Sequence, residues 1–298
     1  MLKRFQRGAL GRSGRIVTAA AIFLFFWIAN ANIPTYGADD TMLLAPTHKS
    51  ALKPGDTIHE CDVCPVMVVV PAGSFIMGSP STEQSRSPNE GPQRTVMITK
   101  PFAVSKFELT FDEWDACTAN GGCNQYRPAD EGWGRERQPV INVTWKDAQR
   151  YVSWLSQTIG KTYRLLTEAE YEYAARAGTQ TPFPWGDEIG EGKANCMGCG
   201  AAKRDKPVPV GSFAPNKFGL YDMVGNVWAW VQDCVHNDYK GAPTNGSIWV
   251  EGGNCDGHIV RGGSWFSAPP SLRSASRSGD GTENRSDILG IRVGRTLD

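Results

Sequence analysis

Several common functional motifs are missing from this sequence of 298 residues. It contains no phosphate-binding loop, no dinucleotide-binding glycine motif, no tandem repeat and no low-complexity tract. Beyond the N-terminal leader it also has no cluster of lysine and arginine, which is the usual sign of nucleic-acid binding. These absences argue against a nucleotide-dependent enzyme and against a nucleic-acid partner.

A second absence is local. The stretch GGSWFSAPPSLRSASR, residues 262–277, holds none of the eight cysteines of the chain. It runs from a double glycine through an aromatic pair and a Pro-Pro turn into a segment with two arginines, Arg273 and Arg277. Its significance comes from the motifs that surround it.

The N-terminus has the layout of a secretory signal peptide. Five basic and no acidic residues precede an apolar core, and small-residue sites follow near Ala31 and Ala38. The core is short for a membrane span of ~20 residues, so we expect a signal peptide over residues 1–31, with residue 38 as a second cleavage position. An uncleaved membrane anchor is the alternative. Cleavage leaves 26 basic against 31 acidic residues in a periplasmic or secreted protein.

An exported chain meets an oxidising compartment, so eight cysteines are expected to form four disulfides. Their spacing suggests three local pairs and one pair across a longer loop, namely Cys61–Cys64, Cys117–Cys123, Cys196–Cys199 and Cys234–Cys255. Other pairings stay open, because eight cysteines permit 105 connectivities. A zinc site built from the two C-x-x-C pairs is the alternative. It is disfavoured because the pairs lie more than 130 residues apart, whereas zinc ribbons separate theirs by ~15–20 residues.

We expect a polar tether over residues 32–60 and an ordered domain over residues 61–298. The apolar run Met67–Val70 predicts a buried strand, and RTVMITKPFAVSKFELT predicts a strand pair. Beyond Gly178, glycine, proline, asparagine and tryptophan dominate. This composition predicts short strands joined by long ordered loops.

Three helix starts are marked by a threonine with an acidic residue three places on: Thr110, Thr144 and Thr167. This is the capping-box pattern, in which the threonine accepts from an unpaired N–H and the acid reaches back. Gly160 is expected to end the second helix.

The ten tryptophans recur in loop settings, as in PWG and GSW. We favour a core role for each, because large aromatic side chains can replace regular secondary structure as core. A platform for sugar or peptide binding is the alternative.

Taken in order, several segments resemble the formylglycine-generating enzyme (sulfatase-modifying factor) family. They are VVVPAGSFIMGS, FAVSKFELTFDEW, PVINVTWKDAQRYVSWLS, YRLLTEAEYEYAARAG, PWGDE, APNKFGLYDMVGNVWAW, VRGGSW and GIRVGR. They run from about Met67 to Arg295. The resemblance implies a single α+β domain with a C-type-lectin-related core, low regular secondary structure and long ordered loops.

The family's oxidases place two cysteines after the GGS motif. These cysteines bind copper and use dioxygen to turn a substrate cysteine into formylglycine. Matching the motif from Gly262 puts Ser267 and Leu272 at the two positions. Copper(I) prefers thiolates, so we expect no copper and no catalytic residue of that kind. Whether another enzymatic activity is present stays open.

The family also carries structural calcium, bound by hard oxygen ligands. Its first site maps onto Asn195, the carbonyl of Cys196 and Asp205, and its second onto Asp222 and the carbonyls of Gly225 and Val227. The usual glutamate of NVWEW is Ala229 here, so the second site lacks one carboxylate. We expect at least one calcium to remain. Plain loop capping by Asn and Asp is the alternative.

The segment around the missing cysteines also offers candidates for a binding groove, namely Trp265, Ser267, Arg273 and Arg277. For the late arginines we favour ion pairs with Glu283, Asp280 and Asp287 over a groove for an anionic group or polypeptide. These arginines are Arg261, Arg273, Arg277, Arg285 and Arg292.

We therefore favour a monomeric binding or maturation factor for an exported polypeptide or small ligand. A modifying enzyme of different chemistry, oxidative or peptide-modifying, on the same fold is the second hypothesis, because a fold does not determine its reaction. A structural or carbohydrate-binding module is the third.

Overall fold

The first and last strands of the described chain lie in one antiparallel sheet. The computed structural model describes residues 51–200 and 205–297. The sheet has the order β1-β2-β5-β11-β6. These strands span Thr57–Ile58, Met67–Val70, Phe102–Ser105, Val293–Thr296 and Tyr163–Leu165. The C-terminal strand β11 pairs with both β5 and β6, so it lies inside the sheet and not at its edge.

Two further sheets complete the strand content of the described residues. The larger has the order β10-β7-β8-β9, over Leu289–Ile291, Trp228–Val235, Asn254–Arg261 and Arg277–Gly281. Its β10–β7 pair is parallel and the other pairs are antiparallel. The smaller is a hairpin of β3 (Gly73–Met77) and β4 (Arg94–Ile98). The predicted strands β4 and β5 are therefore present, but they belong to different sheets.

The three predicted capping boxes are all present, and each opens an α-helix. The helices are α1 (Phe111–Ala119), α2 (Trp145–Ile159) and α3 (Glu168–Arg176). As predicted, α2 ends at Gly160, which has a φ of 70°. Ala177 ends α3 in the same left-handed conformation, one residue before Gly178. Short 3₁₀ helices cover Pro88–Glu90, Cys123–Gln125 and Pro269–Leu272.

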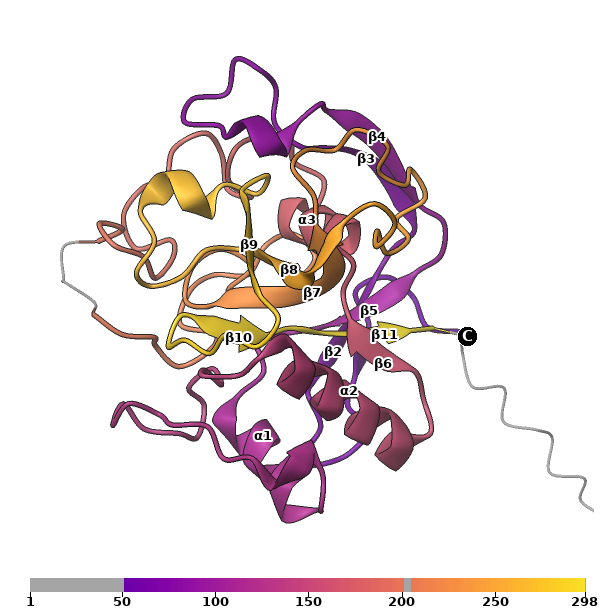
Figure 1. Cartoon of the computed structure of the whole chain (residues 1–298), viewed down its shortest axis with the longest axis vertical. Coiled ribbons are helices and arrows are strands. Elements are labelled where there is room, and N and C mark those ends of the chain that lie inside the picture. The colour runs from indigo at the N-terminus through magenta and orange to yellow at the C-terminus, as the bar shows by residue number, and fades with distance from the viewer. Residues whose placement is uncertain (1–50, 201–204, 298) are drawn as a thin grey trace, which may run out of the picture. The chain divides into compact units, whose positions relative to one another are not determined.

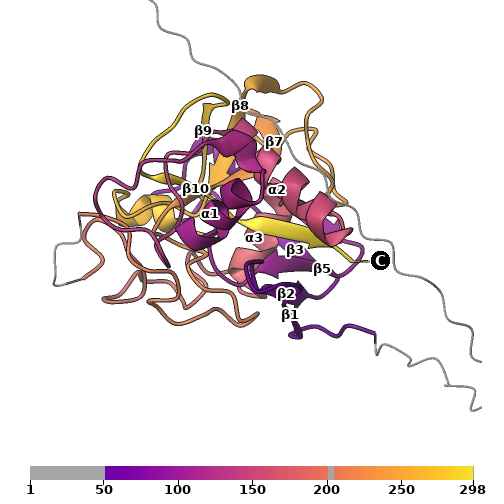
Figure 2. The same cartoon turned by 90° about the horizontal axis from the view of Figure 1, so that it is seen from below.

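The central strands are buried on both faces, which explains their continuous apolar sequence. In β7, Trp228 and Trp230 pack into one core cluster, whereas Ala229 and Val231 pack into another. The first cluster includes residues of α1 and α2, and the second includes residues of α3. Figure 1 shows α1 and α2 on one side of the sheets and α3 on the other, and Figure 2 looks onto α1 and α2.

The ordered domain begins earlier than residue 61. Strand β1 falls inside the predicted tether, where it pairs with β2. Val69 and the Gly55–Asp56 turn also exchange two backbone hydrogen bonds of 2.9 Å. The prediction was wrong for these last residues because a two-residue strand leaves almost no periodic signal. The signal peptide and tether residues up to 50 lie outside the described residues.

The cysteines form the four predicted disulfides. They join Cys61 to Cys64, Cys117 to Cys123, Cys196 to Cys199 and Cys234 to Cys255. The zinc alternative is therefore wrong. No cysteine of the chain keeps a free thiol.

Candidate functional site

The turn after β8 brings the backbone into very close contact with its surroundings. Gly262 and Gly263 have φ values of 98° and 80°, a region that strongly favours glycine. A Cβ at Gly263 would lie 3.0 Å from both Leu272 Cδ1 and the Ser271 carbonyl oxygen. The double glycine is thus needed to fold residues 262–277 back on themselves.

Ser267 closes this turn. Its Oγ accepts a hydrogen bond from the Ser264 N–H at 3.0 Å and lies 3.0 Å from the Ser264 hydroxyl. Its carbonyl oxygen accepts from the Met197 N–H at 3.0 Å. The hydroxyl at the first copper position therefore holds local structure together.

Leu272, at the second copper position, is fully buried. It belongs to a small apolar cluster with Phe183, Ala194, Val224 and the Cys196–Cys199 disulfide. A hydroxyl in a turn and a buried hydrocarbon offer no soft ligand. Because every cysteine is also in a disulfide, these residues do not fit the family's copper centre.

Two predicted groove residues are instead buried in ion pairs. Arg273 is 2.6 Å from Glu83 and 2.5 Å from Glu90, and Arg277 is 2.6 Å from Glu168. Their assignment to a groove was wrong because α3 and the 79–90 segment present carboxylates toward them.

The expected ion-pair partners of the late arginines were also wrong. Arg261 pairs with Glu172, and Arg285 with Asp147. Arg292 donates to backbone carbonyl oxygens, two of which belong to Tyr221 and Asp222.

Trp265 does lie on the surface, within an aromatic cluster. Its ring meets that of Trp133 edge-on at 5.6 Å and that of Phe266 at 5.4 Å. Its Nε1 donates to the Asp287 carbonyl oxygen at 3.1 Å, which fixes the indole. Phe266 is 62% exposed and Met197 is 52% exposed. The Met197 N–H donates to the Ser267 carbonyl oxygen. We call Trp133, Met197, Trp265 and Phe266 the aromatic surface.

The calcium candidates of the two predicted sites are linked through one buried residue, Asn226. The Asn195 Nδ2 donates to Asn226 Oδ1 at 3.1 Å, and the Asn226 N–H donates to the Asn195 carbonyl oxygen. Asn226 Nδ2 in turn donates to Glu108 Oε2 at 2.6 Å. Glu108 Oε1 accepts from the Val227 N–H, and the Gly225 N–H donates to Gly262.

Two side-chain oxygens of the calcium candidates lack a hydrogen-bond partner among the described residues. They are Asn195 Oδ1 and Asp222 Oδ1, both buried. Hard oxygens of this kind suit a calcium ion. The Cys196 carbonyl oxygen accepts from the Cys199 N–H, and Asp205 lies next to residues outside the description. No cluster of three His, Cys, Asp or Glu side chains with metal-binding geometry occurs in the described ranges.

Glu108 is the functional candidate that sequence reasoning missed. Burial raises the pKa of Glu108 well above its usual range, and the nearby Asp222 carboxyl raises it further. Burial also raises the pKa of Asp222, although Arg292 opposes both shifts. A lone acid between Phe107 and Leu109 was the available signal.

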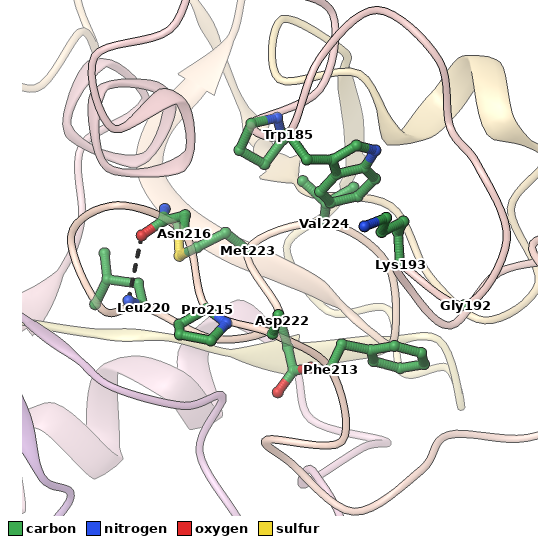
Figure 3. Close-up of a pocket in the computed structure, with 12 residues that line it drawn as sticks. Trp185, Gly192, Lys193, Phe213, Pro215, Asn216, Leu220, Asp222, Met223 and Val224 are labelled. Atoms are coloured by element: carbon green, nitrogen blue, oxygen red, sulfur yellow. Dashed lines mark hydrogen bonds between the residues drawn. The ribbon is translucent and has the colours of Figure 1, made fainter.

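A pocket of about 170 Å³ opens beside the Leu272 cluster. Figure 3 shows its side chains, with Trp185, Lys193, Phe213, Asn216 and Met223 arranged around it. Its lining is completed by Pro184, Gly192, Ala214, Pro215, Leu220, Asp222 and Val224. Trp185 and Val224 belong both to the pocket and to the Leu272 cluster. We call it the Trp185 pocket.

The fold, the glycine turn and its position between β8 and β9 define a domain of the formylglycine-generating type. The family model for the sulfatase-modifying factor enzyme 1-like domain matches residues 55–297, and the chain belongs to this family. The resemblance inferred from the motifs is thus confirmed. The match begins close to β1 and not at residue 61.

The chain is similar to relatives with different names. It is 30% identical to the inactive C-alpha-formylglycine-generating enzyme 2 of Bos taurus, covering 76% of this chain and 86% of that protein. It is 28% identical to the hercynine oxygenase of Mycolicibacterium smegmatis, covering 76% of this chain and 60% of that protein. The solved structure of PvdO from Pseudomonas aeruginosa is 41% identical with a TM-score of 0.76, and the match covers 83% of this chain and 100% of that one.

No helix in residues 51–200 and 205–297 has the length and apolarity needed to cross a membrane.

Proposed function

We propose that this protein is an exported member of the family without cysteine-oxidase activity, and that it acts as a binding or maturation factor for an exported polypeptide. One observation supports the loss of cysteine-oxidase activity. Ser267 and Leu272 occupy the copper positions while all eight cysteines are in disulfides. The inactive relative in Bos taurus shares the family and carries a name consistent with this loss.

The aromatic surface supports the binding role. Trp265 is held by its hydrogen bond and by Trp133, whereas Phe266 and Met197 are half or more exposed. Rigid aromatic side chains and adaptable methionines are typical of polypeptide-binding surfaces. The aromatic surface also adjoins Ser267, because the Met197 N–H donates to the Ser267 carbonyl oxygen.

A direct assay tests the loss of oxidase activity. The mature protein is incubated with a CxPxR peptide, copper and dioxygen, and the peptide is examined by mass spectrometry and an aldehyde-reactive probe. A copper-loaded oxidase of the family serves as the positive control. We expect unchanged cysteine, and formylglycine above the no-protein control would refute the proposal.

A peptide array tests the binding role. We expect peptides that bind the wild-type protein to lose at least tenfold in affinity with Trp265→Ala or Phe266→Ala, because aromatic anchors dominate such interfaces. Glu251→Ala, a change at an exposed residue outside the aromatic surface, serves as the control. Binding to a glycan array without any peptide binding would favour the carbohydrate module instead.

Export and calcium are part of the same proposal. N-terminal sequencing of protein recovered from outside the cytoplasm should begin after residue 31 or 38. We propose that Asn195 and Asp222, with nearby carbonyl groups, hold structural calcium. Metal analysis should then find calcium, and a chelator should lower the melting temperature. If metal analysis finds no calcium and the chelator leaves the melting temperature unchanged, the calcium proposal is wrong.

A modifying enzyme is the second candidate. Asp222 lines the Trp185 pocket, and burial raises its pKa and that of its buried neighbour Glu108. The similarity to a protein named hercynine oxygenase is consistent with an oxidative activity of a different kind on this fold. Turnover of a small exported metabolite that is lost with Glu108→Gln, in a variant that keeps wild-type melting, would favour this candidate.

A further inference from the structure

We propose that the Trp185 pocket is a binding site for a small aromatic carboxylate. The indole of Trp185 is fixed before any ligand arrives. One side stacks on Phe183, with centroids 5.5 Å apart and planes 7° apart. Its Nε1 donates to the carbonyl oxygens of Glu188 and Ile189 at 3.0 and 3.1 Å. A rigid aromatic wall of this kind binds a flat ring at low entropic cost.

The size and walls of the pocket suit a single ring. Its volume of about 170 Å³ compares with the ~150 Å³ of an apolar cavity that holds benzene. Leu220, Met223 and Val224 are buried residues of its lining, and Pro215 also lines it. Dispersion contacts from these groups favour an apolar ring with a short substituent.

Of the charged residues that line the pocket, Lys193 favours an anion and Asp222 opposes one. The side chain of Asn216 is fully engaged. Its amide nitrogen donates to two backbone carbonyl oxygens of α3, and its amide oxygen accepts from the N–H groups of Phe218 and Leu220. In Figure 3 the Asp222 carboxylate points away from Trp185, and its Oδ2 accepts from Gly211.

Lys193 remains as the charged group available to a ligand. It is exposed at the rim beside Trp185 (Figure 3), and it makes no ion pair with the residues the structure describes. Three exposed acids of the same loop, Asp187, Glu188 and Glu191, do not line the pocket. They reduce the attraction of Lys193 for an anion, so the expected preference is modest.

This site does not depend on the aromatic surface. Changes at Trp265 and Phe266 test polypeptide binding, and changes at Lys193 and Ala214 test the pocket. Either proposal can therefore fail without the other.

Ligand-observed fluorine NMR of the disulfide-bonded domain measures weak binding directly. The probes are 4-fluorophenylacetate, 2-(4-fluorophenyl)ethanol and 2-(4-fluorophenyl)ethylamine, which differ in charge on similar rings. We expect the carboxylate to bind about fivefold more tightly than the alcohol, as for a partly exposed ion pair. Lys193→Met should abolish that preference and leave alcohol binding unchanged, and Lys193→Arg should preserve it.

Two controls locate the effect. Lys217→Met removes the same charge from an exposed lysine of the neighbouring loop that does not line the pocket, and it should change nothing. Ala214→Phe places a ring at the exposed wall of the pocket and should weaken all three probes at least fivefold without lowering the melting temperature. Tighter binding of the amine, carboxylate affinity unchanged by Lys193→Met or Ala214→Phe, or no carboxylate binding at all would overturn the proposal.

Discussion

Arg261 holds the segment that follows Leu272, and removing its charge should destabilise the whole domain. The side chain is fully buried. Its Nη2 lies 2.5 Å from Glu172 Oε2, and its guanidinium also donates to the carbonyl oxygens of Ser274, Ala275 and Ser276. One side chain thus links α3 to the chain that follows Leu272.

The magnitude follows from what Arg261→Met leaves behind. Glu172 keeps the Gly78 N–H at 2.8 Å and Arg176 at 2.9 Å, but it loses its shortest contact. The three carbonyl groups lose a buried donor. Breaking a buried pair from one side costs about 3–5 kcal/mol, a large share of a typical stability of ~5–15 kcal/mol.

Equilibrium denaturation in guanidinium chloride, with the disulfides intact, measures this cost. Lys146→Met is the matched control, because it breaks the exposed pair with Glu283 and should change stability by no more than about 0.5 kcal/mol. A loss below about 1 kcal/mol for Arg261→Met would show that the buried pair does not stabilise the domain, and would refute the reasoning.

Three further predictions concern other parts of the domain. Burial, with the Glu168 carboxylate nearby, raises the pKa of Asp233 to about 7. Its folded-state pKa lies above the unfolded value, so its contribution to stability is present below about pH 4 and is lost as the pH rises to about 7. Asp233→Asn should therefore destabilise the domain more at pH 5 than at pH 8 in urea denaturation, unlike the exposed control Asp256→Asn; an equal cost at both values would contradict the shift. Thr144→Ala removes the cap of α2 and should cost about 1 kcal/mol, whereas an unchanged denaturation midpoint would show that the capping box is dispensable. Cys234→Ser with Cys255→Ser opens a loop of 21 residues and should cost about 3 kcal/mol, and a melting temperature equal to that of the wild type would count against it.

Local signals in the sequence predicted the parts of the fold that depend on local chemistry. The three threonine caps need only a hydroxyl and an acid three places apart, and the cysteine pairs needed only short spacing. Met67–Val70 was recognisable as a strand because burial on both faces leaves a continuous apolar run.

The buried ion pairs could not be predicted in this way. Arg273 meets Glu90 and Arg277 meets Glu168 across 183 and 109 positions of sequence. The partners expected from the sequence were nearby acids such as Glu283, which instead pairs with Lys146. Nothing local in the sequence indicates which carboxylate of a distant segment, here α3 and the 3₁₀ helix that ends at Glu90, will meet a guanidinium.

The same limit applies to the candidate site. The motif match aligned Ser267 and Leu272 with the family's copper positions, and in the structure both residues follow the double glycine between β8 and β9. The Trp185 pocket was not predicted, since it joins loops around residues 185, 193 and 213–224 that share no sequence pattern.

The two exchanges at the copper positions have a joint structural consequence. The Ser267 hydroxyl accepts the Ser264 N–H and so closes the turn, and Leu272 fills the cluster that contains the Cys196–Cys199 disulfide. A thiol at position 272 would lie in apolar surroundings, where the neutral form is favoured and a metal-binding thiolate is not. The surroundings of Leu272 therefore oppose a copper site as much as the residue itself does. Because Val224 and Trp185 share that cluster with Leu272, the packing around Leu272 also builds one wall of the Trp185 pocket.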